Sequence, residues 1–383
     1  MSKNNKKNSL KYNLIRPISN EKWQPITIPL AAIIISFVAA AIVILLIGKN
    51  PFQAFYSLLQ GAGIMPKPSY AGYKSMLTDF LSLLNAMTPL VFASLAVAVA
   101  YRAGLFNIGV AGQMLVSGFL ATIIVGYSGL DAYIAKPLVL LIGIIAGGLM
   151  GGLVGWLKYK FNINEVVSTI MLNYIAQYVI SFFIQMYYID PVSRQSQYIS
   201  DASRLTLVNV EMGNLKMDIP LGFILAILTA ILIKFVMDKT VVGFELKAVG
   251  SNRKAAKYAG INVGKNTILA MVISGGLAGL AGVTYYLGYY ASIQPKVLSS
   301  IGFDSIAVSL LGNSHPIGVI FSSFLVSIID QGSTYMSSQA GIRQEISSVI
   351  VGLILLFSAC GVYMKYKVSR IKEKEADRKE SKA

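Results

Sequence analysis

Polar side chains are scarce inside the apolar stretches of this sequence, and their types limit the chemistry open to the chain. Amides and carboxylates occur both at the edges and in the interiors of these stretches. A polar group in hydrocarbon is costly unless it faces a bundle interior, a cavity or a partner, so these side chains are candidates to line a path for a polar solute. The alternative, of equal weight, is that they hydrogen-bond neighbouring helices together. The candidates are Asn107, Gln113, Asn164, Glu165, Asn173, Asp304 and Asn313.

Residue types also exclude several chemistries. The 383 residues include one His and one Cys, so no nucleophile set is convincing and we expect no catalytic residue. His315 has no Cys, Asp or Glu at ligand spacing, so we expect no metal site. The string 259–266 lacks the first glycine and the Ser/Thr of a phosphate-cradling loop, and we expect no cofactor on this chain. A neutral, hydroxyl-bearing solute suits the amides better than it would suit charges.

The elements that position these residues are expected to be membrane helices. Hydrophobic residues make up 55% of the chain and charged residues only 13%, which excludes a soluble domain of 383 residues. A bilayer core of roughly 30 Å needs about 20 apolar residues per helix, and runs of that length recur along the sequence. The predicted spans are 26–47, 81–100, 106–125, 137–157, 166–188, 220–237, 268–290, 303–311 with 317–329, and 346–364.

The run 303–311 is too short to cross a membrane alone, so we pair it with 317–329 as a hairpin or as two broken half-helices. The turn between them contains Asn313 and the only histidine. This turn either lines a path at membrane depth or is a surface turn. With this pairing, the prediction is an all-α polytopic membrane protein of about ten transmembrane helices with both termini cytoplasmic.

The distribution of charge predicts the orientation. A net charge of +16 would suit nucleic-acid binding, but most of the 33 lysines and arginines fall in segments that share the cytoplasmic side in this topology. Anionic lipid headgroups account for the basic tails, so we expect membrane lipid and no nucleic acid as a partner. The predicted parts are a basic tail at 1–25, a transmembrane domain at 26–364 with a cytoplasmic loop at 238–266 and outer loops at 49–80 and 189–219, and a charged tail at 365–383.

Regularly spaced glycines form two ridges within predicted spans. Small residues at every fourth position let membrane helices approach closely, so we predict packing surfaces rather than solute contacts. The first ridge is Gly143, Gly147, Gly151 and Gly155, and the second is Gly275, Gly279 and Gly282 with Ala278.

Two segments far apart in the chain are also similar to each other. GLFNI begins at Gly104 before one span, and GFDSI begins at Gly302 before another. Internal repetition is common in transporters, so this similarity hints at a duplicated core.

Four motifs in order along the chain resemble those of permease subunits of bacterial ABC importers in the branched-chain amino acid, ribose and nucleoside group. The second and third motifs look most like those of nucleoside permeases of the guanosine type. The resemblance covers most of the chain, and its four motifs are GLFNIGVAGQML at 104–115, NINEVVSTIMLNYIA at 162–176, FELKAVGSNRKAAKYAGI at 244–261 and GFDSIAVSLLGNSHPIGVI at 302–320.

The resemblance implies a multi-pass subunit of the bacterial cell membrane that forms the path for a small polar solute, with nucleosides favoured. It is not expected to be an enzyme, because a cytoplasmic ABC ATPase would use the ATP. The other implied partners are a second homologous permease and an extracellular substrate-binding lipoprotein. The alternatives are a permease for a simple sugar or a branched-chain amino acid, or an ion-coupled secondary transporter.

In this family picture the segment 245–260 is a coupling helix that inserts into the ATPase. The residues themselves agree with such a helix, because Leu246, Val249, Ala256 and Tyr258 give it an apolar side. An amphipathic helix that lies on lipid is the alternative. The residues expected to couple to the ATPase are Glu245, Ala248, Gly250, Asn252, Ala255, Ala256 and Gly260.

The outer loop 189–219 is long, polar and poor in helix signals. We expect it to dock the lipoprotein, with a lid or a solvated connector as an equal alternative. The outer segment 49–80 is expected to form a second such surface.

Overall fold

The computed structural model describes residues 24–343, 345–359 and 370. Nearly all of the predicted tails 1–25 and 365–383 therefore lies outside the described residues. The α-helices are α2 Gln24–Leu46, α3 Pro51–Gly61, α4 Met76–Arg102, α5 Val110–Ala121, α6 Ala132–Phe161, α7 Glu165–Phe183, α8 Leu221–Lys239, α9 Val241–Ser251, α10 Arg253–Tyr258, α11 Val263–Thr284, α12 Ile301–Leu311, α13 Pro316–Ala340 and α14 Glu345–Ala359.

Three of these helices continue as single π-helical turns. α5 continues into η1 (Thr122–Gly126), α7 into η2 (Ile184–Tyr188) and α11 into η4 (Tyr285–Tyr289). A short 3₁₀ turn, η3 (Asp201–Ser203), precedes the strands β1 (Thr206–Met212) and β2 (Leu215–Pro220).

Long apolar helices confirm the predicted fold class. Within the described residues, seven helices are long and apolar enough to cross a membrane, while Val110–Gly126 and α12 are shorter. A helix satisfies its own backbone hydrogen bonds, which is why apolar runs of this length adopt it in lipid. The chain is thus an all-α, polytopic membrane protein. Ten crossings and two cytoplasmic termini stay predictions, and the predicted continuation of α14 to Met364 lies beyond the described residues.

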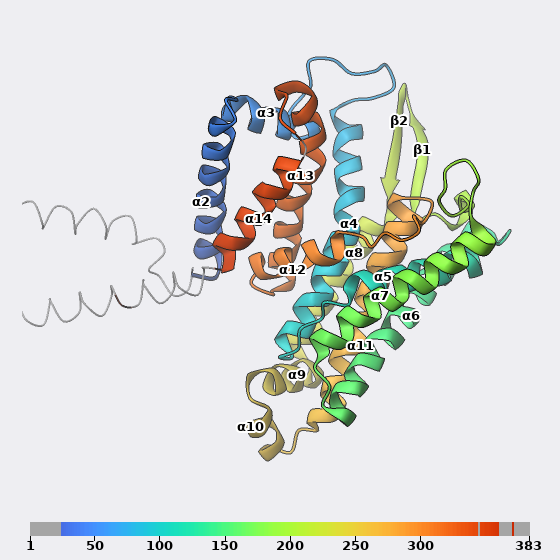
Figure 1. Cartoon of the computed structure of the whole chain (residues 1–383), viewed down its shortest axis with the longest axis vertical. Coiled ribbons are helices and arrows are strands. Elements are labelled where there is room, and N and C mark those ends of the chain that lie inside the picture. The colour runs from blue at the N-terminus through green and yellow to red at the C-terminus, as the bar shows by residue number, and fades with distance from the viewer. Residues whose placement is uncertain (1–23, 344, 360–369, 371–383) are drawn as a thin grey trace, which may run out of the picture.

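The helices are arranged around α4, which is almost completely buried. The largest apolar core joins α4, α5, α6 and α11, and a second cluster joins α2, α3, α13 and α14. Figure 1 shows α2 and α14 side by side, so the two ends of the described chain pack together. The pair α9 and α10 lies at one end of the molecule, and the β1–β2 hairpin lies at the other (Figure 1).

The two glycine ridges pack against each other, which confirms that they are helix-packing surfaces. A Cβ atom on Gly151 would lie 2.9 Å from the Cα of Gly275, and one on Gly147 would lie 2.8 Å from the Cα of Gly279. α6 and α11 are therefore in backbone contact, which only small residues allow.

The outer loop 189–219 contains strands that the sequence analysis did not predict. β1 and β2 pair antiparallel, with Met212 opposite Leu215 across the two-residue turn Gly213–Asn214. Gly213 has φ +65°, the left-handed conformation that glycine tolerates. The signal was present, because a Gly-Asn pair between segments of alternating polarity is typical of a tight hairpin.

Candidate functional site

α9 and α10 replace the single coupling helix expected at 245–260. The side chain of Asn252 accepts hydrogen bonds from the backbone N–H groups of Lys254 (3.0 Å) and Ala255 (3.1 Å), which starts α10 and separates it from α9. Asn252 itself has extended backbone angles, so the chain bends there. Gly260 follows α10 with φ +82°. The segment is thus two short helices with a corner at Asn252.

One side of α9 and α10 faces the rest of the chain. Leu246, Val249 and Ala256 are buried, as their apolar character predicts. Tyr258, which was expected on the same side, is instead 93% exposed. The corner at Asn252 resets the helical phase, so a residue in α10 does not continue the buried face of α9.

Close contacts attach this helix pair to the end of α4. A Cβ atom on Gly250 would collide with the carbonyl oxygen of Arg102 and would lie 2.9 Å from the backbone nitrogen of Gly104. The Arg253 guanidinium donates a hydrogen bond to the Gly104 carbonyl (3.3 Å). The small size of Gly250 therefore serves a contact inside the chain, and its part in docking an ATPase stays a prediction.

Polar contacts attach the same pair to α8 and α11. The Asn266 side chain donates to the Glu245 carboxylate (2.8 Å), and Lys247 pairs with Asp238 (3.4 Å). Glu245 and Ala248 are half-buried, whereas Ala255 is exposed. The helix pair is consequently anchored to three membrane helices rather than lying free on the surface.

The outward side of the pair carries apolar residues that were not among the predicted coupling residues. Val241 is 72%, Phe244 65% and Tyr258 93% exposed. Large apolar side chains gathered on an exposed end of a protein often mark a protein–protein contact. The spacing of Val241 and Phe244, three residues apart on a helix, was the available sequence signal.

Three of the candidate path residues form a buried hydrogen-bond network rather than an open surface. Asn107 is 1% exposed, and its amide donates to the Gln113 side chain (3.0 Å) and to the Ser274 hydroxyl (2.9 Å). Ser274 in turn donates to the Ala96 carbonyl of α4 (2.7 Å). The network fixes the bend between α4 and α5, which is why α5 begins at Val110 and not at Phe106 as predicted.

Asn173 extends this network to α7. Its side chain accepts from the Gly112 N–H (2.9 Å) and donates to the Ile108 carbonyl (2.9 Å), and it is 2% exposed. Asn107, Gln113 and Asn173 thus hold four helices together, as the helix-bonding alternative expected, and their contact with a solute stays a prediction.

Asn164 and Glu165 lie at the start of α7. Asn164 caps this helix by accepting from the Val166 N–H (2.9 Å), and Glu165 pairs with Lys158 at the end of α6 (2.7 Å). Arg253 is close enough to act electrostatically on Glu165, so both residues lie at the end of the molecule that holds α10. Neither is near the middle of a span.

The turn between α12 and α13 lies at that same end. Arg102 donates to the Ser314 carbonyl (2.7 Å), and exposed Asn313 takes the left-handed conformation with φ +54°. Burial, helped by the neighbouring Arg102 and Lys234 charges and opposed by Asp238, lowers the pKa of His315 below its usual range. These contacts favour a surface turn for Asn313 over a place at mid-membrane depth.

Asp304 differs from the other candidates, because it is partly open to the surface. It lies in the first turn of α12, half-buried, and its carboxylate is close enough to Asp330 of α13 for the two to interact electrostatically. The structure thus separates the seven path candidates into a buried network, a group at the coupling end, and Asp304.

Comparison with known proteins decides the family. Residues 80–359 match the family described as branched-chain amino acid transport system / permease component. The chain belongs to this permease family. It is 35% identical to the guanosine ABC transporter permease protein NupP of Bacillus subtilis, over 91% of this chain and 97% of the relative. It is 34% identical to the nucleoside ABC transporter permease protein NupB of Lactococcus lactis, over 94% and 98%.

One solved structure also matches this permease, a putative metal-chelate type ABC transporter in an inward-facing conformation. It shares 14% sequence identity with a TM-score of 0.44, over 82% of this chain and 96% of the other. The family match runs from α4 into α14, so it includes the buried network and the α9–α10 pair.

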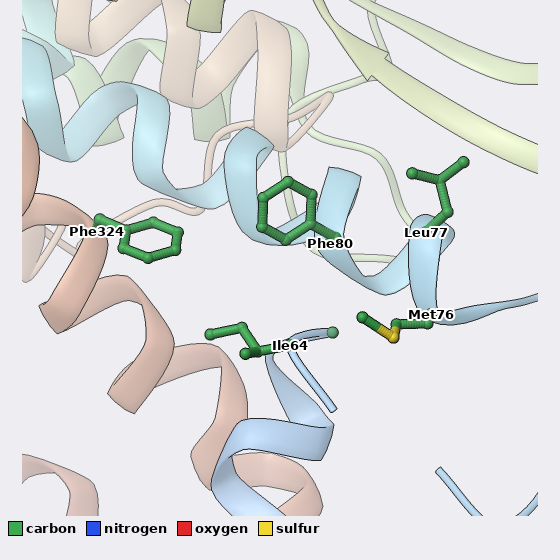
Figure 2. A pocket seen from close by; sticks show the side chains of 6 residues that line it. Ile64, Met76, Leu77, Phe80 and Phe324 are labelled. Atoms are coloured by element: carbon green, nitrogen blue, oxygen red, sulfur yellow. The ribbon is translucent and has the colours of Figure 1, made fainter. Parts of the chain in front are cut away.

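The permease also has an apolar groove near the start of α4, with a volume of about 580 Å³ (Figure 2). Its lining contains no charged or hydrogen-bonding side chain, so it does not suit a polar solute. The lining residues are Gly63, Ile64, Met76, Leu77, Phe80 and Phe324.

Proposed function

We propose that this permease is one of two membrane-spanning subunits of an ATP-driven importer of nucleosides in a bacterial plasma membrane. The observation that carries the proposal is the anchored α9–α10 pair, which presents exposed apolar side chains at one end of a bundle of membrane helices. Family membership and two relatives of at least 34% identity, named for guanosine and nucleoside transport, support the class of solute.

ATPase docking explains the properties of the α9–α10 pair. Val241, Phe244 and Tyr258 would enter a cleft on the ATPase, while Lys254 and Lys257 keep the free pair soluble. Contacts of Gly250 and Arg253 with the turn after α4 would carry the movement into the bundle. A lipid-bound helix would also bury apolar residues, but it would not need anchoring to α4, α8 and α11.

The other partners follow from the same proposal. A second permease of this family would complete the path, because one chain supplies only one wall. An extracellular binding lipoprotein would dock on the opposite end, where the β1–β2 hairpin and α3 lie (Figure 1). The hairpin carries exposed Glu211, Met212 and Lys216, a mixed surface suited to a transient contact.

The first test is to tag the chain, solubilise native membranes gently and identify what co-purifies by mass spectrometry. We expect an ATPase, a second permease and a lipoprotein. The complex is then reconstituted in proteoliposomes, and ATP-dependent uptake of guanosine, glucose and leucine is compared. Recovery of the chain alone, with uptake driven by an ion gradient and no ATP, would contradict the proposal, and uptake of glucose or leucine alone would contradict its solute.

A pair of variants tests the docking surface. Phe244→Ala with Tyr258→Ala removes two exposed aromatic groups, and we expect loss of most of the co-purified ATPase and at least a tenfold fall in uptake, as about 1.4 kcal/mol of contact energy corresponds to tenfold. Phe182→Ala is the matched control, since Phe182 is 56% exposed and lies about 26 Å along α7 from Glu165, the residue near α10. Equal ATPase recovery in the two variants would place the docking surface elsewhere.

A further inference from the structure

The segment 290–300 between η4 and α12 is irregular backbone that is bonded to the loop after η2 at Ala291 and Ile293 and then to the middle of α7 at Lys296. Gln177 donates from its side chain to the Lys296 carbonyl (2.6 Å), and the Lys296 N–H donates to the Ser181 hydroxyl (2.7 Å). At 1.5 Å per residue, Gln177 lies about 18 Å from the start of the span Glu165–Tyr188 and about 16 Å from its end. The segment therefore returns from the end of η4 to mid-span depth.

Non-helical backbone at that depth is stable only where protein covers it or where it faces water. The segment is not fully covered by the rest of this chain, because Gln294, Lys296, Val297 and Ser300 are all exposed. A lysine ammonium at mid-span cannot face hydrocarbon without a large cost, so this side of the chain faces water or a polar partner.

Charged and hydrogen-bonding side chains of α12, α13 and η4 extend this surface. Asp304 and Asp330 are near enough to interact electrostatically, and the Gln331 amide donates to the Tyr289 hydroxyl (2.9 Å). Asp330 lies about 21 Å along α13 from Pro316, so it too is far from the end of its span. Together with Lys296 and Ser300, these residues form what we call the mid-depth band: Lys296, Ser300, Asp304, Asp330 and Gln331, with Tyr289, the last residue of its own span, joined to it through the hydrogen bond from Gln331.

The charges of the mid-depth band are not neutralised by ion pairs. Across residues 24–343 and 345–359, none of the salt bridges involves Lys296, Asp304 or Asp330. The buried amides at Asn107, Gln113 and Asn173 are in contrast hydrogen-bonded to protein. Among the described residues, the band thus holds one ammonium and two carboxylates without an ion-pair partner, and charges within a span mark solute pathways in membranes.

We propose that the mid-depth band lines the translocation path and contacts a neutral solute that carries both hydroxyl groups and an aromatic ring. Carboxylates accept hydrogen bonds from sugar hydroxyls, and a tyrosine ring offers a stacking face to a base. A nucleoside combines these two parts, so the assignment rests on the proposed function and names the residues that would meet the solute.

Cysteine labelling of the complete transporter in proteoliposomes tests water access. The background variant is Cys360→Ser, which removes the only cysteine. Val297→Cys and Ser300→Cys probe the surface around the band, and Leu149→Cys on α6 is the control, because Leu149 is 71% exposed at mid-span beside an apolar surface. A membrane-impermeant thiol reagent is applied to both sides, with and without guanosine.

We expect labelling of Val297→Cys and Ser300→Cys at least tenfold faster than that of Leu149→Cys, and slower labelling when guanosine is being transported. Rates equal to the Leu149→Cys control would overturn the proposal, and would indicate that a second permease or lipid covers the band. Labelling that guanosine does not slow would overturn the contact with solute.

Asp304→Asn gives a second measurement. The amide keeps the shape of the carboxylate but lacks its charge, so we expect a fall of about tenfold in maximal guanosine uptake with unchanged co-purification of the partner subunits. Full uptake by this variant and by Asp330→Asn would count against the band. Failure of the proposed function is separable, because then the Cys360→Ser background would itself not transport guanosine.

Discussion

Similar sequences stand just before the short helix α5 (GLFNI) and in the first turns of the short helix α12 (GFDSI), but their polar residues lie in opposite environments. Asn107 precedes α5 and is 1% exposed within a hydrogen-bond network, whereas Asp304 in α12 is partly open and has Asp330 as a like-charged neighbour. The two helices meet, because a Cβ atom on Gly302 would lie 2.5 Å from the Cβ of Ala111. The residues before α5 thus hold neighbouring helices together by buried hydrogen bonds, whereas the residues of α12 contribute to an exposed polar surface.

The difference comes from the neighbours of each helix. The segment before α5 is enclosed by α4, α7 and α11, which supply Ser274 and Asn173 as partners. The segment before α12 is bonded to the loop after η2 through Ala291 and Ile293 and to α7 through Lys296, while its residues Gln294, Lys296, Val297 and Ser300 stay exposed. A buried polar group needs protein partners, while an open one retains the capacity to bind a solute.

The largest expected effect on stability is at Asn107, in the buried hydrogen-bond network before α5. In Asn107→Asp the side chain loses the two donated hydrogen bonds to Gln113 and Ser274 and gains a buried charge, which should cost about 3 kcal/mol or more of stability. The thermal midpoint in detergent measures it. Asn164→Asp is the control, because that exposed cap needs only an acceptor. Equal thermal midpoints for both variants would show that the network before α5 does not stabilise the protein more than an exposed helix cap does.

The second largest effect is expected at the contact between α5 and α12. In Gly302→Val the new side chain would have to displace the backbone of Ala111, and overpacking of this kind costs about 1–3 kcal/mol. Gly352→Val on α14 is matched in chemistry but has open space around it, so we expect a much smaller shift of its thermal midpoint. If Gly302→Val unfolds at the same temperature as Gly352→Val, the helices do not depend on each other.

A substitution at Asp304 in α12 should change solute uptake but not the stability of the protein. Asp304→Asn is expected to change the free energy of unfolding by less than about 0.5 kcal/mol, since the carboxylate is partly exposed and unpaired by cations among the described residues. Measuring the thermal midpoint together with guanosine uptake separates the two roles. A loss of stability comparable with that of Asn107→Asp would mean that Asp304 also holds neighbouring helices together.

The smallest effect is a dependence on pH at the turn that ends α12. The pKa of His315 is lowered from its usual 6.5 by burial and by Arg102, so the unfolded chain takes up a proton at a pH at which the folded chain does not. Stability contributed by the neutral imidazole is present above about pH 6.5, falls as the pH drops through that value, and stops falling below the folded pKa.

His315→Asn keeps an acceptor for the Ile317 N–H and removes the titrating group. The decrease in thermal midpoint between about pH 7.5 and pH 5.5 should therefore be smaller in this variant than in the unchanged protein. Parallel pH profiles for the two would show that His315 does not contribute.

Features that depend on local sequence were predicted correctly. The length and apolarity of each run predicted the spans that became α4, α6, α7, α8 and α11, and the fourfold spacing of Gly147 and Gly151 predicted a packing ridge. The motifs led to the right permease family. A run of apolar residues and a spacing of four are properties of one segment, so no distant partner is needed to recognise them.

Only the tertiary structure determined whether each polar residue is buried or exposed and which partners it has. Asn107 is buried because Ser274, 167 positions away, supplies its partner, and Lys296 reaches mid-span because Gln177 and Ser181 bind its backbone. Tyr258 is exposed because one capping residue, Asn252, bends the chain before it. The sequence alone determined that polar groups had to enter the membrane, but the cost of burying them depends on long-range partners, which exist only in the folded chain.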